Sequence, residues 1–169
     1  ANPTDPVSLA AAASTVAERV DRIHRLVICT GILHGGDAEP DFRPEKSLGQ
    51  LSLEHLQRSV AVNAWAPLAT IHAFAGLLRH AEGAVAAALS AMVGSIGDNR
   101  LGGWYSYRMS KAALNMGIRN AAIELGRHRH GPIVGAIHPG TTLSPLSAPF
   151  AARDRARPAD ASAAAIVRV

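Results

Sequence analysis

The chain has 169 residues, of which 48% are hydrophobic and 18% are charged, with a formal net charge of +4. This composition is typical of a globular protein and excludes an intrinsically disordered chain. Charged residues or histidines interrupt each apolar run before it reaches bilayer-spanning length, and the start "ANPTDPVSL" lacks the pattern of a signal peptide. We therefore expect a cytoplasmic protein with no membrane partner. Because the basic residues are scattered without interleaved aromatics, we expect no nucleic-acid partner either.

The first helix is predicted over residues 7–24, where apolar residues recur at helical spacing. Thr4 or Asp5 can cap its start, and Pro6 suits the first helical position. The apolar run at residues 26–29 follows, which predicts a strand buried on both faces. Its last residue is the single cysteine, Cys29, which cannot form an internal disulfide. A buried structural thiol is the favoured interpretation, and a reactive thiol is the alternative.

The middle of the chain is predicted to hold a loop, a long helix and a second strand. Residues 31–51 are rich in Gly, Pro and charge and indicate the loop. The pattern over residues 52–80 predicts the helix, capped by Ser52 and interrupted near Pro67. The apolar run "GAVAAALSA", residues 83–91, predicts the second strand.

The last third of the chain repeats this alternation. Residues 104–129 predict a helix that ends in "GRHRHG", where basic side chains complement the helix terminus, so we expect no metal site there. The run "PIVGAIHPG", residues 132–140, predicts a third strand. The tail at residues 151–169 is rich in Arg and Ala, with a short helix expected over residues 160–169.

Apolar strands that alternate with helices predict an α/β fold, a Rossmann-like doubly wound parallel sheet within one domain, residues 1–169. Ligands of such sheets bind at the carboxyl ends of the strands. Those ends carry "CTG", "SAMVGS" and "HPGTT", where Gly and polar residues collect. We therefore expect a binding site at this edge.

The predicted helix over residues 104–129 carries a polar pair at this edge. Tyr107 and Lys111 are four residues apart and share a helix face, so the ammonium group can lie near the phenol. A nearby positive charge lowers the pKa of a phenol from about 10, as general acid–base chemistry near neutral pH requires. A lone Tyr-x-x-x-Lys is common by chance, so the pair by itself favours a structural interpretation over a catalytic one.

Further motifs surround this pair in a fixed order: "VICTG", "PEKSL", "VNAWAPL", "VGSIGDNRLGGWYSYRMSKAALNM" and "IHPGTT". With them, residues 1–150 resemble the short-chain dehydrogenase/reductase family, and most closely its C-factor-like and sniffer-like carbonyl reductases. The resemblance implies hydride transfer between NAD(P)(H) and a small carbonyl or alcohol substrate. It does not distinguish NADP from NAD.

The same resemblance implies a catalytic set of four residues. Tyr107 would exchange the proton with the substrate oxygen, and Lys111 would depress the pKa of Tyr107 and hold the nicotinamide ribose. Ser95 would hydrogen-bond the substrate carbonyl, and Asn63 would anchor a water molecule that links Lys111 to solvent. In structural terms alone, Ser95 could cap a turn and Asn63 could satisfy backbone groups in a kinked helix.

The serine has an alternative position. Ser95 lies twelve residues before Tyr107, as the family spacing requires. By its position at the end of the strand, however, the catalytic serine would be Ser90 or would fall on Ala91. The spacing favours Ser95.

The resemblance also implies a set of cofactor-binding residues in addition to Tyr107 and Lys111. The set comprises Asn2, Gly31, Pro139, Gly140, Thr142 and Ser144. Asn2 matches a position where many family members have an Asp that contacts adenine, and Ser144 stands where they usually have a Thr.

The glycine-rich phosphate loop of the family, G-x-x-x-G-x-G, does not occur near this N-terminus. The resemblance therefore implies an incomplete Rossmann-like domain with three recognisable strands, and we expect a segment of a longer reductase that is inactive as this fragment. The alternative is a degenerate, non-catalytic member that acts as a binding or signalling module. The helices over residues 52–80 and 104–129 resemble the pair through which family members form homodimers or homotetramers.

Overall fold

The computed structural model describes residues 1–150 and 156–168, so the predicted tail, 151–169, is described only in part. The described elements alternate between helices and strands along the chain. In chain order they are α1 (Pro6–Ala17), β1 (Arg25–Ile28), η1 (Gly36–Ala38), η2 (Leu48–Gln50), α2 (Leu53–Val60), the π-helical turn η3 (Ala61–Trp65), α3 (Ala66–Phe74), β2 (Val85–Leu89), η4 (Met92–Gly94), α4 (Tyr105–Gly126), β3 (Ile133–Ile137) and α5 (Ala159–Val167).

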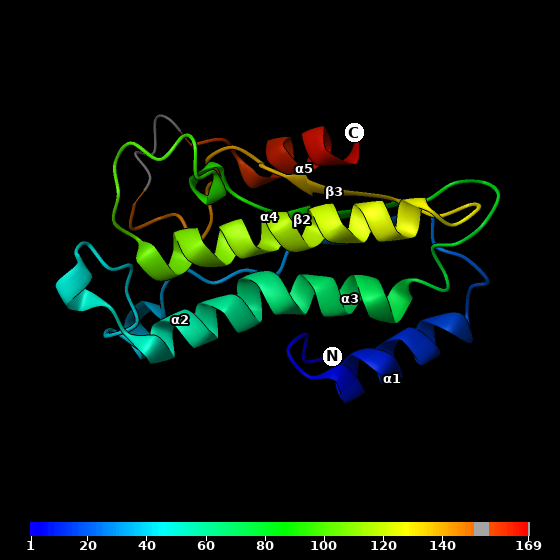
Figure 1. Cartoon of the computed structure of the whole chain (residues 1–169), viewed down its shortest axis with the longest axis horizontal. Coiled ribbons are helices and arrows are strands. Elements are labelled where there is room, and N and C mark those ends of the chain that lie inside the picture. Colours follow the sequence, from blue (N-terminus) through cyan, green and yellow to red (C-terminus); the bar gives the residue numbers. More distant parts are fainter. Residues whose placement is uncertain (151–155, 169) are drawn as a thin grey trace.

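The three strands form a parallel sheet in the order β1-β2-β3. Val85 of β2 is in register with Arg25 on one side and Ile133 on the other. Figure 1 shows α4 and the α2–α3 rod side by side, with α1 beside α3 and α5 near β3. The predicted α/β class and parallel sheet are therefore confirmed.

The core lies between one face of the sheet and these helices. Ala84, just before β2, and Ala86 and Ala88 within it alternate along the chain and belong to the same core as the buried helical residues Leu114 and Ile118. Their small side chains allow a helix to pack closely on the strand.

Burial on both faces was predicted for the first strand, and this is wrong: β1 is exposed on one face, and so is β3. Residues 86–88 of β2 are buried in succession, whereas Val27 of β1 is 41% exposed and Ile133 of β3 is 71% exposed. The two strands are the edges of the described sheet, and no described helix covers Val27 or Ile133 on the face opposite the core. Apolar character alone could not show whether a neighbour was present.

The helix predicted over residues 52–80 is a composite of α2, η3 and α3. Ser52 caps it as expected, since its hydroxyl accepts a hydrogen bond from His55 N at 3.3 Å. The interruption occurs just before Pro67, which has no N–H to donate to the carbonyl of Asn63. The π turn shifts the hydrogen-bond ladder at this point. The helix ends at Phe74, six residues earlier than predicted.

The other helices begin close to where the sequence predicted. Asp5 caps α1 by accepting hydrogen bonds from Val7 N and Ser8 N, with Pro6 as the first helical residue, although the helix ends at Ala17 rather than at residue 24. α4 covers Tyr105–Gly126 within the predicted 104–129, and α5 covers Ala159–Val167 against the expected 160–169. Of the described residues, no helix is long and apolar enough to cross a membrane.

Candidate functional site

A cleft of about 770 Å³ opens at the carboxyl ends of the three strands. Its walls come from the loops that follow β1, β2 and β3, from the start of α4 and from α5. Most of the residues that the sequence marked as functional line it: Gly31, Tyr107, Lys111, Pro139, Gly140, Thr142 and Ser144. The parallel topology explains this convergence, because it brings the ends of all strands to one edge.

Tyr107 and Lys111 face the cleft from adjacent turns of α4. Their exposed fractions are 9% and 3%, so both polar groups are largely withdrawn from water. Lys111 Nζ lies 5.9 Å from the centroid of the Tyr107 ring and donates a hydrogen bond to the carbonyl of Leu89 at 2.8 Å. The lysine therefore connects the end of β2 to the helix that carries the tyrosine.

Burial controls the ionisation of this pair. It raises the pKa of Tyr107 above its usual value of 10.0, and it lowers the pKa of Lys111 from 10.5 to about 8. The lowering of the Tyr107 pKa that the sequence led us to expect from Lys111 does not prevail in this structure, because burial raises that pKa. The ammonium group is directed to the Leu89 carbonyl rather than to the phenol, and desolvation disfavours the phenolate. Tyr107 is thus a protonated donor at neutral pH.

Asn63 connects this pair to the loop after β1. It lies in the π turn, is fully buried, and exchanges hydrogen bonds with the backbone of Ile32: Ile32 N donates to Oδ1 at 2.7 Å and Nδ2 donates to the Ile32 carbonyl at 2.9 Å. Nδ2 also donates to Ser110 Oγ at 2.9 Å, and that hydroxyl donates to the Tyr107 carbonyl at 2.8 Å. π turns are frequent at functional sites.

Gly31 joins these groups at the cleft wall. A Cβ added to Gly31 would lie 3.6 Å from Asn63 Oδ1 and 3.8 Å from Lys111 Nζ. The backbone of the loop after β1 therefore passes directly beside the amide and the ammonium group. Lys111 has three N–H donors, and a single one is used by the Leu89 carbonyl among the contacts of the described residues. The remaining donors are available to hydroxyl groups of a molecule bound in the cleft.

The structure separates the two candidate serines. Ser90 and Ala91, which follow β2, line the cleft, whereas Ser95 is not among the described residues that do so. The Ser95 hydroxyl accepts a hydrogen bond from Asp98 N at 3.3 Å, which is a turn-capping contact. Ser90 Oγ donates to Asn115 Oδ1 at 2.6 Å, so its proton is already engaged within the protein. Of the hydroxyls weighed from the sequence, the one at the cleft is Ser90.

Two further sequence-marked residues lie elsewhere than expected. Asn2 is exposed, and its side-chain oxygen accepts hydrogen bonds from Thr4 N and Thr4 Oγ1, away from the described cleft lining. Cys29 is exposed and lines the cleft, so the prediction of a buried structural thiol is wrong. Strand β1 ends at Ile28, although the apolar run continues to Cys29, and Cys29 therefore lies beyond the strand at the cleft.

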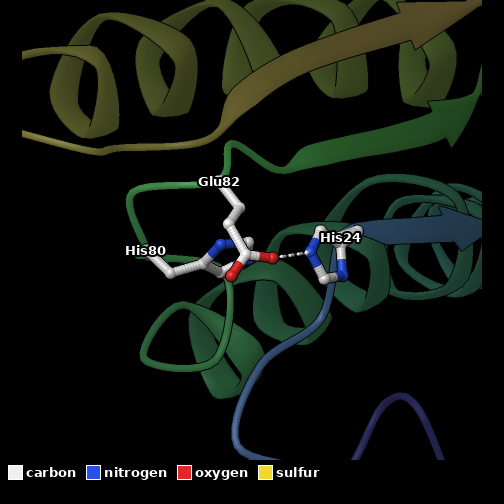
Figure 2. A group of neighbouring side chains, drawn as sticks. All are labelled: His24, His80 and Glu82. Atoms are coloured by element: carbon white, nitrogen blue, oxygen red, sulfur yellow. Dashed lines mark hydrogen bonds and ion pairs between the residues drawn. The ribbon is translucent and has the colours of Figure 1, made fainter.

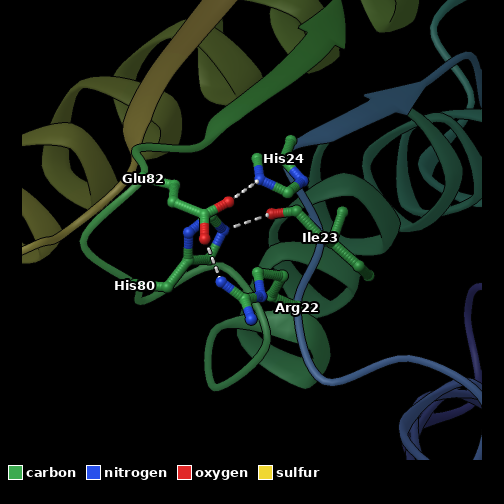
Figure 3. Close-up of polar contacts among 5 residues, drawn as sticks. All are labelled: Arg22, Ile23, His24, His80 and Glu82. Atoms are coloured by element: carbon green, nitrogen blue, oxygen red, sulfur yellow. Dashed lines mark hydrogen bonds and ion pairs between the residues drawn. The ribbon is translucent and has the colours of Figure 1, made fainter.

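A second polar cluster lies at the opposite, amino-terminal end of the strands. In the part of the chain that the structure describes, His24, His80 and Glu82 form a group in which one potential metal-ligand atom from each lies within 4.8 Å of the others (Figure 2). Their atoms already bond within the protein. Glu82 pairs with Arg22 and accepts a hydrogen bond from His24 Nε2 at 2.8 Å, and His80 Nε2 donates to the carbonyl of Ile23 at 3.0 Å (Figure 3).

These contacts link the segment that leads into β1 to the loop before β2. The hydrogen bond with His24 and the charge of Arg22 hold the pKa of Glu82 below its usual range. Because the Arg22 guanidinium carries a permanent positive charge at the carboxylate, it opposes a divalent cation there. The geometry therefore favours an internal polar network over a metal site.

Comparison with known proteins identifies the family of this chain. A family model described as enoyl-(acyl carrier protein) reductase matches residues 1–169. The chain belongs to the short-chain dehydrogenase/reductase family. It is 40% identical over 103 residues to 1-hydroxy-2-glutathionyl-2-methyl-3-butene dehydrogenase of Rhodococcus sp. (strain AD45). This alignment covers 61% of this chain and 44% of that protein. It is 32% identical over 123 residues to C-signal of Myxococcus xanthus, covering 73% of this chain and 70% of that protein.

A solved carbonyl reductase has the same fold. The NADPH-bound carbonyl reductase from chicken fatty liver matches 99% of this chain and 66% of its own length, with a TM-score of 0.83 and 27% sequence identity. The chain thus spans under half the length of the Rhodococcus dehydrogenase and about two thirds of the chicken reductase. The family resemblance predicted from the sequence is confirmed.

Sequence reasoning missed three residues that shape this family site. Ser110 bridges Asn63 and the Tyr107 backbone, and Trp104 and Phe150 line the cleft. Ser110 immediately precedes Lys111, and its spacing of three from Tyr107 was an available signal. Trp104 follows two glycines, a pattern that indicated an unusual turn but not the direction of the ring. Phe150 is distant in sequence and carried no signal.

Proposed function

We propose that this chain carries the proton-transfer site of an NAD(P)(H)-dependent carbonyl reductase or alcohol dehydrogenase. The observation that carries the proposal is the buried Tyr107–Lys111 pair, which faces a cleft at the carboxyl ends of a parallel sheet. Two of the similar proteins are named as a dehydrogenase and a carbonyl reductase, and the reductase holds NADPH. The substrate is a small carbonyl or alcohol compound.

The residues at the cleft fit a nicotinamide cofactor. Among the contacts of the described residues, Lys111 keeps donors for ribose hydroxyls, and Gly31 keeps the adjacent wall free of a side chain. Gly140 has a φ of 77°, a conformation that favours glycine, and it lets the loop with Pro139 and Thr142 bend along the cleft. These residues, with Ser144, would bind the nicotinamide half. When bound, the cofactor supplies or accepts the hydride.

Tyr107 is the proposed acid in the reducing direction. Burial keeps its phenol protonated, so the proton is present when negative charge develops on the substrate oxygen. Lys111, with its pKa lowered to about 8, is a compact cation near the ring and stabilises the phenolate that remains. Asn63 and Ser110 hold the backbone of Tyr107 through buried hydrogen bonds, which keeps the phenol oriented toward the cleft.

A serine hydroxyl at the cleft would hydrogen-bond the substrate oxygen. Ser90 is the candidate that the geometry favours, since it lines the cleft and Ser95 does not belong to its described lining. The contact of Ser90 Oγ with Asn115 must be exchanged when substrate binds. Such hydrogen bonds are often assembled only in the complex with substrate.

The test is the Tyr107→Phe variant, with Tyr105→Phe as the matched control on the same helix. Loss of the acid should reduce the rate of carbonyl reduction about 10²- to 10⁴-fold, as is usual for a general acid. Tyr105 is not among the described cleft residues, so its variant should turn over as the wild type does. The measurement is NADPH and NADH oxidation with a panel of aldehydes and ketones. Wild-type turnover by Tyr107→Phe would refute the mechanism.

A second candidate is a binding or signalling module without turnover. The engaged proton of Ser90 and the position of Ser95 favour it, as does the similarity to a protein named C-signal. This candidate predicts saturable binding of NADH or NADPH, measured by cofactor fluorescence, with no oxidation of the cofactor by any carbonyl compound. Steady turnover would exclude it.

We also propose that the protein functions in the cytoplasm as a homodimer or homotetramer through α2–α3 and α4. Large apolar side chains remain exposed on these helices, including Trp65 at 50%, Met109 at 49% and Met116 at 64%. Exposed apolar side chains that gather on neighbouring helices mark association surfaces. Size-exclusion chromatography with light scattering tests this, and a Met109→Glu/Met116→Glu variant should dissociate. A monomeric wild type would refute it.

A further inference from the structure

The segment that enters α4 has a rare backbone conformation. Gly102, Gly103 and Trp104 have successive φ values of 65°, 63° and 52°. The first two are glycines, for which positive φ has no steric penalty, but Trp104 carries a large side chain in the left-handed region. Such strain persists only where surrounding contacts hold the backbone, and it is concentrated at functional sites.

Contacts from two directions hold this segment. Trp104 N donates to the carbonyl of Glu45, and the Glu45 carboxylate accepts hydrogen bonds from Ser106 N at 3.1 Å and from the Ser106 hydroxyl. Glu45 is 3% exposed, so the amide and the hydroxyl of Ser106, in the first turn of α4, hold a buried carboxylate. From the other side, Arg108 Nε donates to the carbonyls of Gly102 at 3.2 Å and Gly103 at 3.0 Å.

The held conformation directs the Trp104 ring into the cleft. Trp104 and Phe150 both line it, with ring centroids 5.0 Å apart in an edge-to-face arrangement. The centroid of the Tyr107 ring lies 6.2 Å from that of Trp104. An aromatic wall therefore begins next to the phenol that would protonate the substrate, and Leu33 and Leu146 extend it with apolar surface.

We propose that the cleft accepts aryl ketones or aryl aldehydes, whose aromatic ring packs on Trp104 while the carbonyl oxygen reaches Tyr107. This inference rests on the proposed function for its chemistry, although binding of the aryl group does not require turnover. Rings prefer edge-to-face or offset contacts at the spacing seen here, and a tryptophan provides the largest aromatic surface for them. Glu45 acts as a positioning residue for Trp104, because its carbonyl accepts from Trp104 N and its carboxylate anchors Ser106, two residues further along α4.

Fluorescence tests the binding directly. The chain has two tryptophans, Trp65 and Trp104. In the Trp65→Phe protein, with NADPH present, emission comes from Trp104 alone, and acetophenone should quench it with a saturable curve. The Trp104→Phe protein, which reports only Trp65, is the matched control for non-specific quenching and light absorption by the ligand. Equal quenching in both proteins would overturn the aryl site.

Turnover tests the preference. Acetophenone should be reduced with a higher kcat/KM than cyclohexyl methyl ketone, which has the same size but no aromatic ring. Trp104→Gly removes the ring and tolerates the positive φ, so it should fold as well as the wild type and lose about tenfold of that preference. Trp104→Phe should retain most of it. An unchanged ratio in a folded Trp104→Gly would overturn the inference.

The two proposals fail separately. If no carbonyl compound is turned over but acetophenone saturably quenches Trp104, the reductase function fails and the aryl site stands. If carbonyl compounds are reduced while the two ketones are used equally by wild type and Trp104→Gly, the function stands and the aryl site fails. For Glu45, Glu45→Gln should preserve the ketone preference better than Glu45→Ala, whereas equal loss in both variants would remove its positioning role.

Discussion

Replacing Lys111 with methionine should stabilise the fold and abolish its proposed chemistry. Lys111 is 3% exposed, and burial lowers its pKa from 10.5 to about 8. That difference corresponds to about 3 kcal/mol of unfavourable free energy for the buried charge at neutral pH. The variant also loses the hydrogen bond to the Leu89 carbonyl, worth about 1 kcal/mol. We therefore expect Lys111→Met to unfold with a free energy about 2 kcal/mol larger than the wild type at pH 7.

The pH dependence distinguishes this cause from better packing. Below about pH 8 both the folded and the unfolded wild type carry the lysine proton, so the penalty is fully present. Between about pH 8 and 10.5 the unfolded chain binds more protons than the folded chain, so wild-type stability rises with pH through this group. The advantage of Lys111→Met should shrink over the same interval.

Urea denaturation followed by circular dichroism, at pH values from 6 to about 10, provides the measurement. Lys46, the other lysine of the chain, is exposed, and Lys46→Met serves as the matched control with little effect at any pH. NADPH-dependent carbonyl reduction is measured in parallel and should be lost only in Lys111→Met. A variant less stable than wild type at pH 7, or an advantage that is constant up to pH 10, would contradict the reasoning.

Three further predictions concern the walls of the site. In steady-state kinetics, Ser90→Ala should lower kcat/KM for carbonyl reduction about tenfold or more, whereas Ser95→Ala should leave it unchanged. A loss in Ser95→Ala with none in Ser90→Ala would show that Ser95 is the residue that acts on the substrate. Asn63→Ala removes buried hydrogen bonds to Ile32 and Ser110 and should destabilise by about 2–4 kcal/mol in urea unfolding, and a loss below about 0.5 kcal/mol would argue against that network. Gly94→Ala should lower Tm, because its Cβ would lie 2.9 Å from the Lys111 backbone, while Gly97→Ala meets no atom within 4 Å and should leave Tm nearly unchanged; similar Tm values for both would refute the close approach.

The parts of the fold that depend on local chemistry were predictable. Asp5 with Pro6 and Ser52 mark helix starts because capping satisfies amides within a few residues. The apolar run at residues 83–91 predicted a strand correctly, and β2 is buried along its middle, with a neighbouring strand on each side. Val27 and Ile133 are equally apolar but exposed, and sequence pattern carries no information on which neighbour covers a strand.

Some features of the site were likewise predictable from the sequence, and others were not. The spacing of Tyr107 and Lys111 was sufficient to place them on one helix face, and spacing along the chain favoured Ser95 over Ser90. The end of β2 nevertheless brings Ser90 to the cleft, because a loop can change direction between the strand and residue 95. The π turn around Asn63 was also unpredictable in detail, although Pro67 indicated an interruption nearby.

The sequence by itself determined the alternation of strands and helices, the helix caps and the shared face of Tyr107 and Lys111, because each follows from contacts within about one helical turn or from strand periodicity. Only the tertiary structure decided the direction of the Tyr107 pKa, the partner of the Lys111 ammonium group and the turn of the Trp104 ring into the cleft. The pKa of Tyr107 depends on desolvation, which is summed over all atoms that surround the group. The direction of the Trp104 ring depends on a strained backbone that is held by Glu45, a residue far away in sequence.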